Sequence, residues 1–514
     1  MTQTLEPRSA APSRTTYEAV TARVDPMAAA RSATLMAALD ALDRAGLPYC
    51  VTHGYVGLPE VVSSDVDAVT APGDLAGPVP RALLAAAPET TLVQWFDDRA
   101  CGGVVAGPGV DGVPSLVQLH FSPAFEPDGV QCYPAADVLA GRHRHNGIWA
   151  IAGTTEFACV LANRVTKESL KEKHTSRLSQ LYAADPAGCG RAIQRLWTGP
   201  SADNVLDAAR TGRWNVVQPM LPQLDQELRK RCRGENGVGK WARRVGRWLR
   251  PTSGLHVVFL GPDGVGKSTV IEAVKASLSP AFLRYSYQTF APSLIPTPLQ
   301  PKKETPHQLP PRGLAASLLK AAWWCVCYTA GYYASVRPTV ARAGLVLNHR
   351  YLPDAIVDPK RYRYGGPSWI LRALWKVAPK PDLLFVLDAP AEVIQSRKKE
   401  VAPAETARQR EGYRAVARGM PNAHVISTDR SLAEVVGEVN GIVLRHMSAR
   451  VARRVGTGQS PAVSARGERS SHLPEAMPAP LGSVPARDAG CARPGPTRPG
   501  PAGSRPVGDA EGTP

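Results

Sequence analysis

The chain has 514 residues, which is enough for two to four domains with substantial cores. Its 61 lysines and arginines outnumber 44 aspartates and glutamates, giving a net charge of +17, so we expect phosphorylated or otherwise anionic partners. The nine cysteines are dispersed and form no C-x-x-C pair, which argues against a disulfide framework and a zinc site. The polar N-terminus argues against a secretory signal. Together these two features predict a cytoplasmic protein.

Residues 1–30 are predicted to be a flexible N-terminus, and residues 31–225 to form an α+β domain. Apolar spacing predicts a helix at residues 32–45, which Gly46-Leu47-Pro48 would end. Short apolar runs between glycine, proline and aspartate clusters predict strands of a small mixed sheet at residues 49–52, 66–70, 91–95, 103–105 and 116–121. Further helices are predicted at residues 156–182 and 190–197.

An acidic pair follows a glycine turn in this first domain. His53-Gly54-Tyr55 precedes Asp65-Val66-Asp67, and carboxylates at i and i+2 of a strand share a face, where a divalent metal could bridge them. The pattern resembles the nucleotidyltransferase fold, which implies a weak site at Asp65 and Asp67. His120 stands where that family places a third carboxylate, and Tyr55 replaces a small residue. The alternative is a solvated strand end.

Residues 226–253 form a basic connector. Nine lysines and arginines between residues 229 and 250 face a single acid, and Trp241, Val245, Trp248 and Leu249 share one helical face. The segment is predicted to be a cationic amphipathic helix. It could pack on a neighbouring domain as a solvated helix, make peripheral contact with an anionic membrane, or offer a path for an anionic polymer.

The stretch from Leu255 to Val270 joins an apolar run, a glycine-rich turn and a helix-compatible segment. The turn fits G-x-x-x-x-G-K-[ST], in which backbone N–H groups and a helix N-terminus bind phosphate. Lys267 would reach the β- and γ-phosphates, and the Ser268 hydroxyl would bind Mg²⁺. The predicted ATP-binding residues are Gly261, Asp263, Gly264, Val265, Gly266, Lys267, Ser268 and Thr269. The alternative is a chance match in a glycine-rich chain.

An apolar run at residues 314–336 is long enough for a membrane span. A span there would divide the nucleotide-binding domain, so we predict a buried or peripherally docked helix, with membrane contact as the alternative. Strands predicted at residues 344–348, 382–388 and 424–427 alternate with helices, which indicates an α/β domain over residues 254–447 with a doubly wound parallel sheet. Residues 448–514 are rich in proline, glycine, alanine and arginine and are predicted to be a disordered tail.

The phosphate-binding turn, Asn348-His349-Arg350-Tyr351, the basic loop at residues 358–367 and Pro-Asp-Leu-Leu-Phe-Val-Leu-Asp at residues 381–388 together resemble the thymidylate kinase-like branch of P-loop kinases. The resemblance implies phosphoryl transfer from ATP to a nucleoside monophosphate or related small acceptor, and a dimer. It implies catalytic roles for Lys267, Arg350 and Arg397, with Arg408 and Arg410 as further lid candidates. The acceptor-binding candidates are Asp263, Arg350, Tyr351, Arg361 and Arg363.

One position departs from that family. His349 stands where the family has an aspartate, and a neutral imidazole is a poor substitute because Mg²⁺ prefers oxygen ligands. Asp354 or Asp388 could replace it. Three hypotheses follow: an ATP- and Mg²⁺-dependent phosphotransferase, a nucleotide-binding regulator or scaffold, and a nucleotidyltransferase acting through Asp65 and Asp67. The resemblance associates the second with surface-polysaccharide biosynthesis. Specific nucleic-acid binding is not expected, because no recognised nucleic-acid module is present.

Overall fold

The computed structural model describes residues 25–62, 65–97, 101–234, 253–292, 309–398 and 402–456. All of these residues belong to one compact unit. Most of the predicted flexible N-terminus, the predicted amphipathic face around Trp241 and Trp248, and most of the predicted tail lie outside the described residues. The boundaries predicted between domains stay predictions.

The N-terminal half (residues 25–234) is built on a mixed seven-stranded sheet in the order β3-β4-β5-β2-β1-β10-β9. Its strands are β1 (Tyr49–Val51), β2 (Val66–Thr70), β3 (Thr91–Asp97), β4 (Cys101–Val110), β5 (Val113–Ser122), β9 (His143–His145) and β10 (Ile148–Ala150). The first five match the five predicted strands. β2 runs antiparallel to β1 and parallel to β5, which confirms a mixed sheet.

Helix α1 (Pro26–Arg44) begins earlier than predicted, so the prediction of flexibility is wrong for residues 26–30. The Asp25 carboxylate accepts a hydrogen bond from the Met27 amide (3.0 Å) and Pro26 occupies the first helical position, two features that favour a helix start. The predicted helix at residues 156–182 is also wrong, because it is two helices separated by a turn in which Glu168 has φ +45°.

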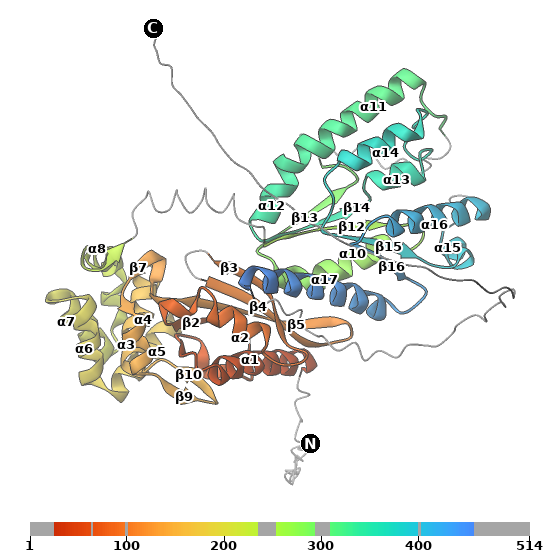
Figure 1. Cartoon of the computed structure of the whole chain (residues 1–514). Helices are drawn as coiled ribbons and strands as arrows, with labels where there is room; N and C mark the ends of the chain where they lie inside the picture. Colours follow the sequence, from red (N-terminus) through yellow and green to blue (C-terminus); the bar gives the residue numbers. More distant parts are fainter. Residues whose placement is uncertain are drawn as a thin grey trace, which may run out of the picture. The chain divides into compact units, whose positions relative to one another are not determined.

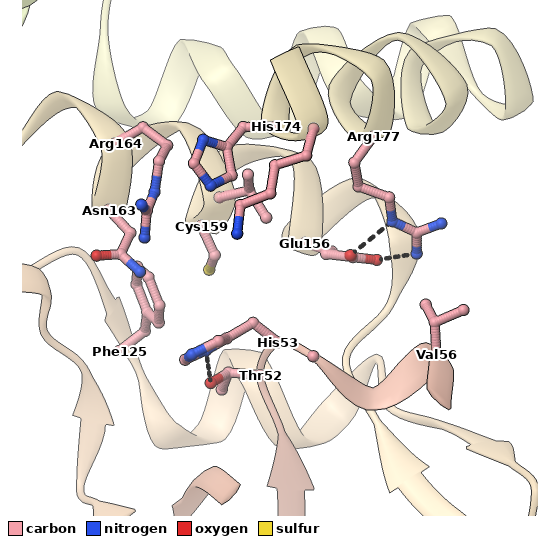
Figure 2. Close-up of a pocket in the computed structure, with 13 residues that line it drawn as sticks. Thr52, His53, Val56, Phe125, Glu156, Cys159, Asn163, Arg164, His174 and Arg177 are labelled. Atoms are coloured by element: carbon pink, nitrogen blue, oxygen red, sulfur yellow. Dashed lines mark hydrogen bonds and ion pairs between the residues drawn. The ribbon is translucent and has the colours of Figure 1, made fainter. Parts of the chain in front are cut away.

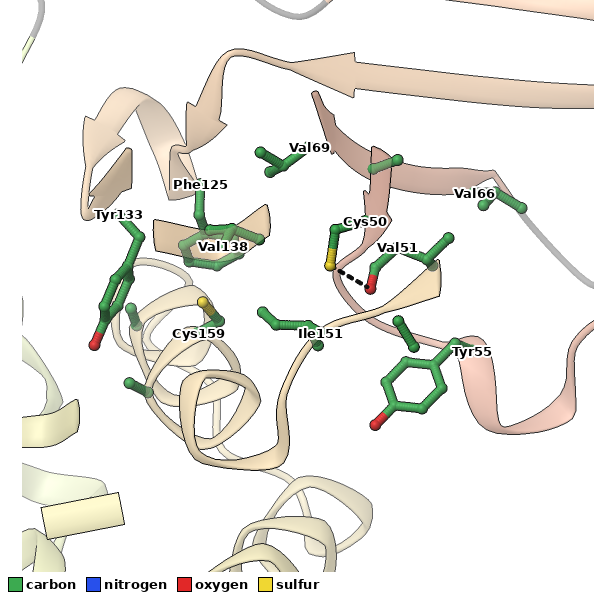
Figure 3. Packing of buried hydrophobic residues seen from close by; sticks show 14 of the residues in the cluster. Cys50, Val51, Tyr55, Val66, Val69, Phe125, Tyr133, Val138, Ile151 and Cys159 are labelled. Atoms are coloured by element: carbon green, nitrogen blue, oxygen red, sulfur yellow. Dashed lines mark hydrogen bonds between the residues drawn. The ribbon is translucent and has the colours of Figure 1, made fainter. Parts of the chain in front are cut away.

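The remaining helices of this half are α2 (Pro78–Leu84), α3 (Ala135–Ala140), α4 (Gly153–Val165), α5 (Glu172–Ala184), α6 (Pro186–Leu196), α7 (Pro200–Thr211) and α8 (Leu221–Arg231). The short strand pairs are β6 (Ala124–Phe125) with β8 (Tyr133–Pro134), and β7 (Val130–Gln131) with β11 (Arg233–Gly234). The predicted connector helix therefore does not begin at residue 229, since α8 ends at Arg231 and β11 follows. Figure 3 shows Cys50 of β1 on the side of Phe125, Ile151 and Cys159 in the core of this half.

The C-terminal half (residues 253–456) has a five-stranded sheet in the order β13-β14-β12-β15-β16, and every neighbouring pair is parallel. The strands are β12 (Leu255–Leu260), β13 (Arg284–Thr289), β14 (Gly344–His349), β15 (Leu383–Asp388) and β16 (Ala423–Ser427). This arrangement confirms the predicted α/β class and parallel sheet. The prediction missed β13, an edge strand whose residues are polar and largely exposed.

Both faces of this sheet are covered by helices (Figure 1). Helices α10 (Lys267–Leu278) and α17 (Leu432–Val455) pack on the face that presents Val257 and Phe259. The opposite face, with Val258 and Leu260, meets helices α11 (Leu314–Val326), α13 (Leu352–Val357), α14 (Ser368–Val377) and α16 (Pro403–Arg418). Helix α15 (Ala391–Arg397) follows β15.

The apolar run at residues 314–336 is a helix docked on the sheet, as predicted. It comprises α11 and a π-helix over Cys327–Val336, continued by α12 (Arg337–Ala341). Ala321, Trp324 and Tyr328 are buried against the sheet, whereas Leu319 and Trp323 face outward. No helix among the described residues has both the length and the apolarity of a membrane span.

Helix α17 connects the two halves. It runs to Val455 with a capping box at Ser431 and Glu434, so the predicted tail is wrong for residues 448–455. Val435, Val436 and Val439 share one apolar cluster with Val93 and Val104 of the N-terminal sheet. In addition, the Asn440 side-chain amide donates to the backbone oxygen of Gly112 (2.8 Å). The two halves therefore have a common core.

Candidate phosphate-binding site

The glycine-rich turn leaves β12 at Leu260 and enters α10 at Lys267, at the carboxyl ends of the parallel strands. Gly261 has φ +144°, and a Cβ placed there would lie 2.4 Å from the backbone oxygen of Leu387. Gly266 has φ +92°, which also favours glycine. Within the turn Val265 is buried, while Ser268 and Thr269 are exposed in the first turn of α10. The turn therefore has the order of strand, glycine-rich turn and helix that the phosphate-binding motif requires.

Lys267 is buried beneath this loop. Its Nζ atom donates to the backbone oxygens of Gly261 and Pro262, at 2.8 Å each, and lies 3.6 Å from Asp263 Oδ1. Burial and the neighbouring Arg350 lower the pKa of Lys267 to about 8. The ammonium is thus held within the loop by backbone oxygens, close to where the motif predicts phosphate contacts.

Asp263 also forms ion pairs with two arginines. Arg350 and Arg361 each donate a guanidinium N–H to one of its carboxylate oxygens. Arg350 directly follows β14 and has φ +84°, a costly conformation for a residue other than glycine. The Arg350 amide donates to the Phe259 backbone oxygen (3.0 Å), which fixes this turn against β12. The predicted residues Asp263, Lys267, Arg350 and Arg361 are therefore brought together.

Asp354 on α13 holds Arg350 from the other side. Its carboxylate is inaccessible to solvent and accepts hydrogen bonds from Arg350 Nη1 (2.6 Å), Tyr362 Oη (2.6 Å) and Tyr413 Oη (2.5 Å). Burial alone would raise the pKa of Asp354, but the Arg350 charge and the two hydroxyl donors outweigh it and lower that pKa. Asp354 is an ionised positioning residue for Arg350.

His349 lies at the end of β14, beside these cations. Burial, Lys267 and Arg350 lower its pKa to about 4, so the imidazole is neutral at pH 7. The ring stacks on Tyr287 with centroids 6.5 Å apart. Asp388, the other proposed substitute carboxylate, accepts hydrogen bonds from Arg410 Nε (2.8 Å) and Arg414 Nη2 (2.5 Å). Both candidate carboxylates are thus engaged with arginines.

The oxygen donors at the loop decide how Mg²⁺ could fit. Ser268 presents an exposed hydroxyl in the first turn of α10. Within the described part of the chain, no group of three or more histidine, cysteine, aspartate or glutamate side chains could hold a metal ion. Mg²⁺ commonly keeps several waters and binds substrate phosphates in addition to a few protein oxygens. The exposed Ser268 hydroxyl fits this pattern, as one protein oxygen beside ligands from water and phosphate.

Three predicted site residues are placed elsewhere. Arg397, at the end of α15, donates to the backbone oxygen of Thr428 (3.1 Å). Tyr351 is fully buried and its hydroxyl donates to the Pro379 backbone oxygen (3.0 Å), so it occupies a core position. Arg363 Nε donates to the Pro310 backbone oxygen (3.0 Å). Of the lid candidates, Arg408 contacts Glu405 and the Val357 backbone oxygen, and Arg410 contacts Asp388.

In the N-terminal half, Asp65 and Asp67 each face an imidazole. His53 Nε2 lies 3.1 Å from Asp67 Oδ2, and His120 Nε2 lies 3.4 Å from Asp65 Oδ2. The register places Asp67 directly opposite His120 across β2 and β5. Burial alone would raise the pKa of Asp67, but His53, His120 and Lys167 together lower it. Within the described residues, no group around this pair could hold a metal ion, so the structure adds no support for a metal bridged by Asp65 and Asp67.

Sequence reasoning missed two groups of functional candidates. The first is the pair of hydroxyls on Asp354, because Tyr413 lies 59 residues further along the chain. The second is a group of cations on α4 and α5 that includes Arg164 and Lys173. The available signal was a run of basic residues between residues 164 and 177, broken by few acids.

No protein-family model matches the chain, and no curated protein matches it. Among solved structures, thymidylate kinase from Ehrlichia chaffeensis aligns with 38% of this chain and 100% of its own length, at 19% identity and a TM-score of 0.28. Thymidylate kinase from Candida albicans aligns with 40% of this chain and 95% of its own length, at 15% identity and a TM-score of 0.30. Neither structure supports the nucleotidyltransferase-like prediction. At these TM-scores the likeness carries no conclusion about activity.

Proposed function

We propose that the chain is an ATP-dependent phosphotransferase that moves the γ-phosphoryl group to a nucleoside monophosphate or a related small acceptor. The observation that carries this proposal is the convergence of Lys267, Arg350 and Arg361 on Asp263 in the glycine-rich loop. A loop with three cations at the N-terminus of α10 suits the polyphosphate of a nucleotide. Phosphoryl transfer needs mainly such positioning and charge stabilisation, with little covalent chemistry from the protein.

The charged groups of the site contact one another and the loop backbone, and these contacts suggest how each residue would act when a nucleotide binds. When a nucleotide binds, Lys267 would exchange the backbone oxygens of Gly261 and Pro262 for phosphate oxygens. Arg350 and Arg361 would move from Asp263 to phosphate, where a planar guanidinium can bind two oxygens at once. Mg²⁺ held by Ser268 would neutralise charge on the β- and γ-phosphates. Asp263 would then contact the acceptor, in line with its predicted role.

A nucleotide-binding regulator is the second candidate. The observation that favours it is the neutral His349 together with the engaged carboxylates of Asp354 and Asp388. Such a site offers ample positive charge for binding, but Asp354 and Asp388, the two carboxylates proposed to orient Mg²⁺-bound water, are already paired with arginines. Nucleotide affinity without turnover is what this arrangement would give.

The test is ADP release by the full chain with ATP, Mg²⁺ and a panel of nucleoside monophosphates and sugar phosphates. We expect acceptor-dependent release that Lys267→Ala abolishes. Lys275→Ala serves as the matched control, because Lys275 lies on the same helix and pairs with Glu272 (3.1 Å) away from the loop. Turnover that is unchanged in Lys267→Ala would overturn the proposal. ATP binding by calorimetry with no turnover on any acceptor would favour the regulator.

A second experiment tests the effect of having His349 where the thymidylate kinase-like family has an aspartate. His349→Asp should raise turnover if a missing carboxylate limits the rate, because carboxylate oxygen suits Mg²⁺ better than a neutral imidazole. An unchanged rate at saturating Mg²⁺ would show that the site as built does not depend on a carboxylate at this position.

A further inference from the structure

A pocket of about 390 Å³ lies in the N-terminal half, apart from the phosphate-binding loop. Figure 2 shows His53 and Thr52 on one side, where β1 ends, with Asn163, Arg164 and His174 on the helices opposite them. Small-molecule sites commonly have volumes of about 300–1,000 Å³. The lining residues include neither Asp65 nor Asp67, and His53 stands between the pocket and Asp67. The pocket is therefore distinct from the site predicted at Asp65 and Asp67.

One end of the pocket is electrically balanced. Arg177 on α5 donates to both carboxylate oxygens of Glu156 on α4 (2.9 and 2.7 Å). The Tyr55 hydroxyl donates to the same carboxylate (2.7 Å) and accepts from Arg177 (3.1 Å). Glu156 is almost completely buried, so this network forms a fixed wall without net charge. Figure 2 shows the pair at the edge of the pocket.

The cations on the other side are not balanced. Arg164 and Lys173 line the pocket, and within the described residues neither forms an ion pair or hydrogen bond with another side chain. Between them, His174 accepts a hydrogen bond from the Lys171 amide at Nδ1 (3.1 Å), which leaves Nε2 to carry the ring proton as a donor. The pocket thus presents two unpaired positive charges and one further N–H donor.

Part of the remaining lining is apolar, beside the polar side chains of Thr52, His53 and Asn163. Phe125, Val160 and Cys159 contribute to the wall, and Phe125 and Cys159 are buried. A site with a cationic end and an apolar wall fits a ligand that joins an anionic group to an organic body. Two positive charges match a phosphate monoester, which carries nearly two negative charges at neutral pH, and arginine binds phosphate oxygens in pairs.

We propose that this pocket binds a small phosphate monoester, whose phosphate is held by Arg164, Lys173 and His174 and whose organic part lies against Phe125 and Val160. The site requires no metal and acts independently of the loop at Lys267. It does not rest on the phosphotransferase proposal, because none of its residues belongs to the C-terminal half.

The test is isothermal titration calorimetry on the full chain carrying Lys267→Ala, which removes binding at the phosphate-binding loop. Inorganic phosphate, glucose 6-phosphate, a nucleoside monophosphate and uncharged glucose are the ligands. We expect saturable binding of inorganic phosphate, tighter binding of at least one of the two esters at one site per chain, and none of glucose. Absence of saturable phosphate binding, or esters no tighter than inorganic phosphate, would overturn the proposal.

Variants then assign the site. Arg164→Ala combined with Lys173→Ala should weaken ester binding at least tenfold, whereas Arg210→Ala should not, since Arg210 pairs with Asp207 on the exposed face of α7. Unaltered affinity in the double variant would refute the assignment. Because Arg164 and Lys173 form no ion pair within the described part of the chain, their loss should leave no buried charge there without a partner. The unfolding temperature checks this expectation. Lys173→Arg, which keeps the charge, should retain binding.

Discussion

At the scale of single residues, the charge balance of the phosphate-binding site depends on Asp354. Its two oxygens receive three hydrogen bonds from side chains that lie on three different segments. Arg350 is almost completely buried and is shared between Asp354 and Asp263. Asp354 therefore allows Arg350 to leave Asp263 for a phosphate without becoming an unpaired buried charge.

The first prediction concerns this buried pair. Asp354→Asn removes the negative charge opposite Arg350 while keeping the size of the side chain. Removal of one partner of a buried ion pair costs about 3–5 kcal/mol, so we expect a loss of about 3 kcal/mol in the free energy of unfolding. Urea denaturation of the full chain measures it. Asp429→Asn, at an exposed carboxylate, is the control and should leave the midpoint unchanged. A loss as small as that of the control would show that Asp263 alone neutralises Arg350.

The second prediction concerns His256 on β12. Burial lowers its pKa to about 4; Asp382 and the hydrogen bond between Nε2 and Asn348 Oδ1 (3.1 Å) act in the opposite direction. The unfolded imidazole titrates near pH 6.5, so between pH 4 and 6.5 the unfolded state binds more protons. Stability is therefore lost as the pH falls through this window. Between pH 7.5 and 5, the loss from this group should be about 2 kcal/mol.

Urea midpoints of the wild type and His256→Gln at both pH values isolate this contribution. The variant keeps a side-chain amide near Asn348 but cannot titrate, so its stability should fall by about 2 kcal/mol less than that of the wild type. Equal pH dependence in the two proteins would mean that His256 is not the group responsible.

At the scale of elements, the turn between β12 and α10 is fixed by the neighbouring strand. Gly261 passes so close to the Leu387 backbone oxygen that a Cβ would lie 2.4 Å away. Leu387 lies on β15, which pairs with β12 on one side and with β16 on the other. Leu387 cannot move away without breaking the pairing of β15 with these two strands. A side chain at Gly261 would therefore clash with β15.

The third prediction follows from this contact. Gly261→Ala should displace the loop, lower the free energy of unfolding by about 2 kcal/mol or more, and abolish nucleotide binding. Gly73→Ala is the matched control: a Cβ there meets nothing within 4 Å and the position has no positive φ. Thermal unfolding and ATP calorimetry on both variants measure the two effects. Nucleotide binding that survives in Gly261→Ala would show that the loop can relax around the added methyl group.

The same elements show what the sequence could predict. The β12–loop–α10 unit is local, because an apolar run, a glycine pattern and a helix follow one another within 16 residues, and it was predicted correctly. Edge strand β13 was not predicted, because its polar residues lack the buried pattern of the central strands. The convergence of Arg361 on Asp263 spans 98 residues. The contact itself was not predicted, although both residues were acceptor-binding candidates. The pocket cations Arg164 and Lys173 gave no motif at all, since their proximity depends on how α4 packs against α5.

At the scale of the whole molecule, the shared core makes the two halves interdependent. The tip of the β4–β5 hairpin meets α17, where a Cβ at Gly112 would lie 2.3 Å from the Ala433 backbone oxygen. The Thr91 and Ser448 hydroxyls form a buried hydrogen bond (3.1 Å) across the same contact. Because α17 also covers α10, the helix that begins at Lys267, packing of the N-terminal sheet supports the phosphate-binding site from behind.

The fourth prediction is that the halves unfold together. Val104 lies on β4, is almost fully buried, and belongs to the cluster that includes Val436 and Val439 of α17. Val104→Ala should cost about 2 kcal/mol, because it deletes buried methyl groups and leaves a cavity. Pulsed thiol labelling in urea, read by mass spectrometry, reports each half separately through Cys50 in the N-terminal half and Cys327 in the C-terminal half, both buried. Since one core joins the halves, the substitution should shift the midpoints of both cysteines equally. A shift at Cys50 alone would show that the halves unfold independently and that α17 transmits no stability between them.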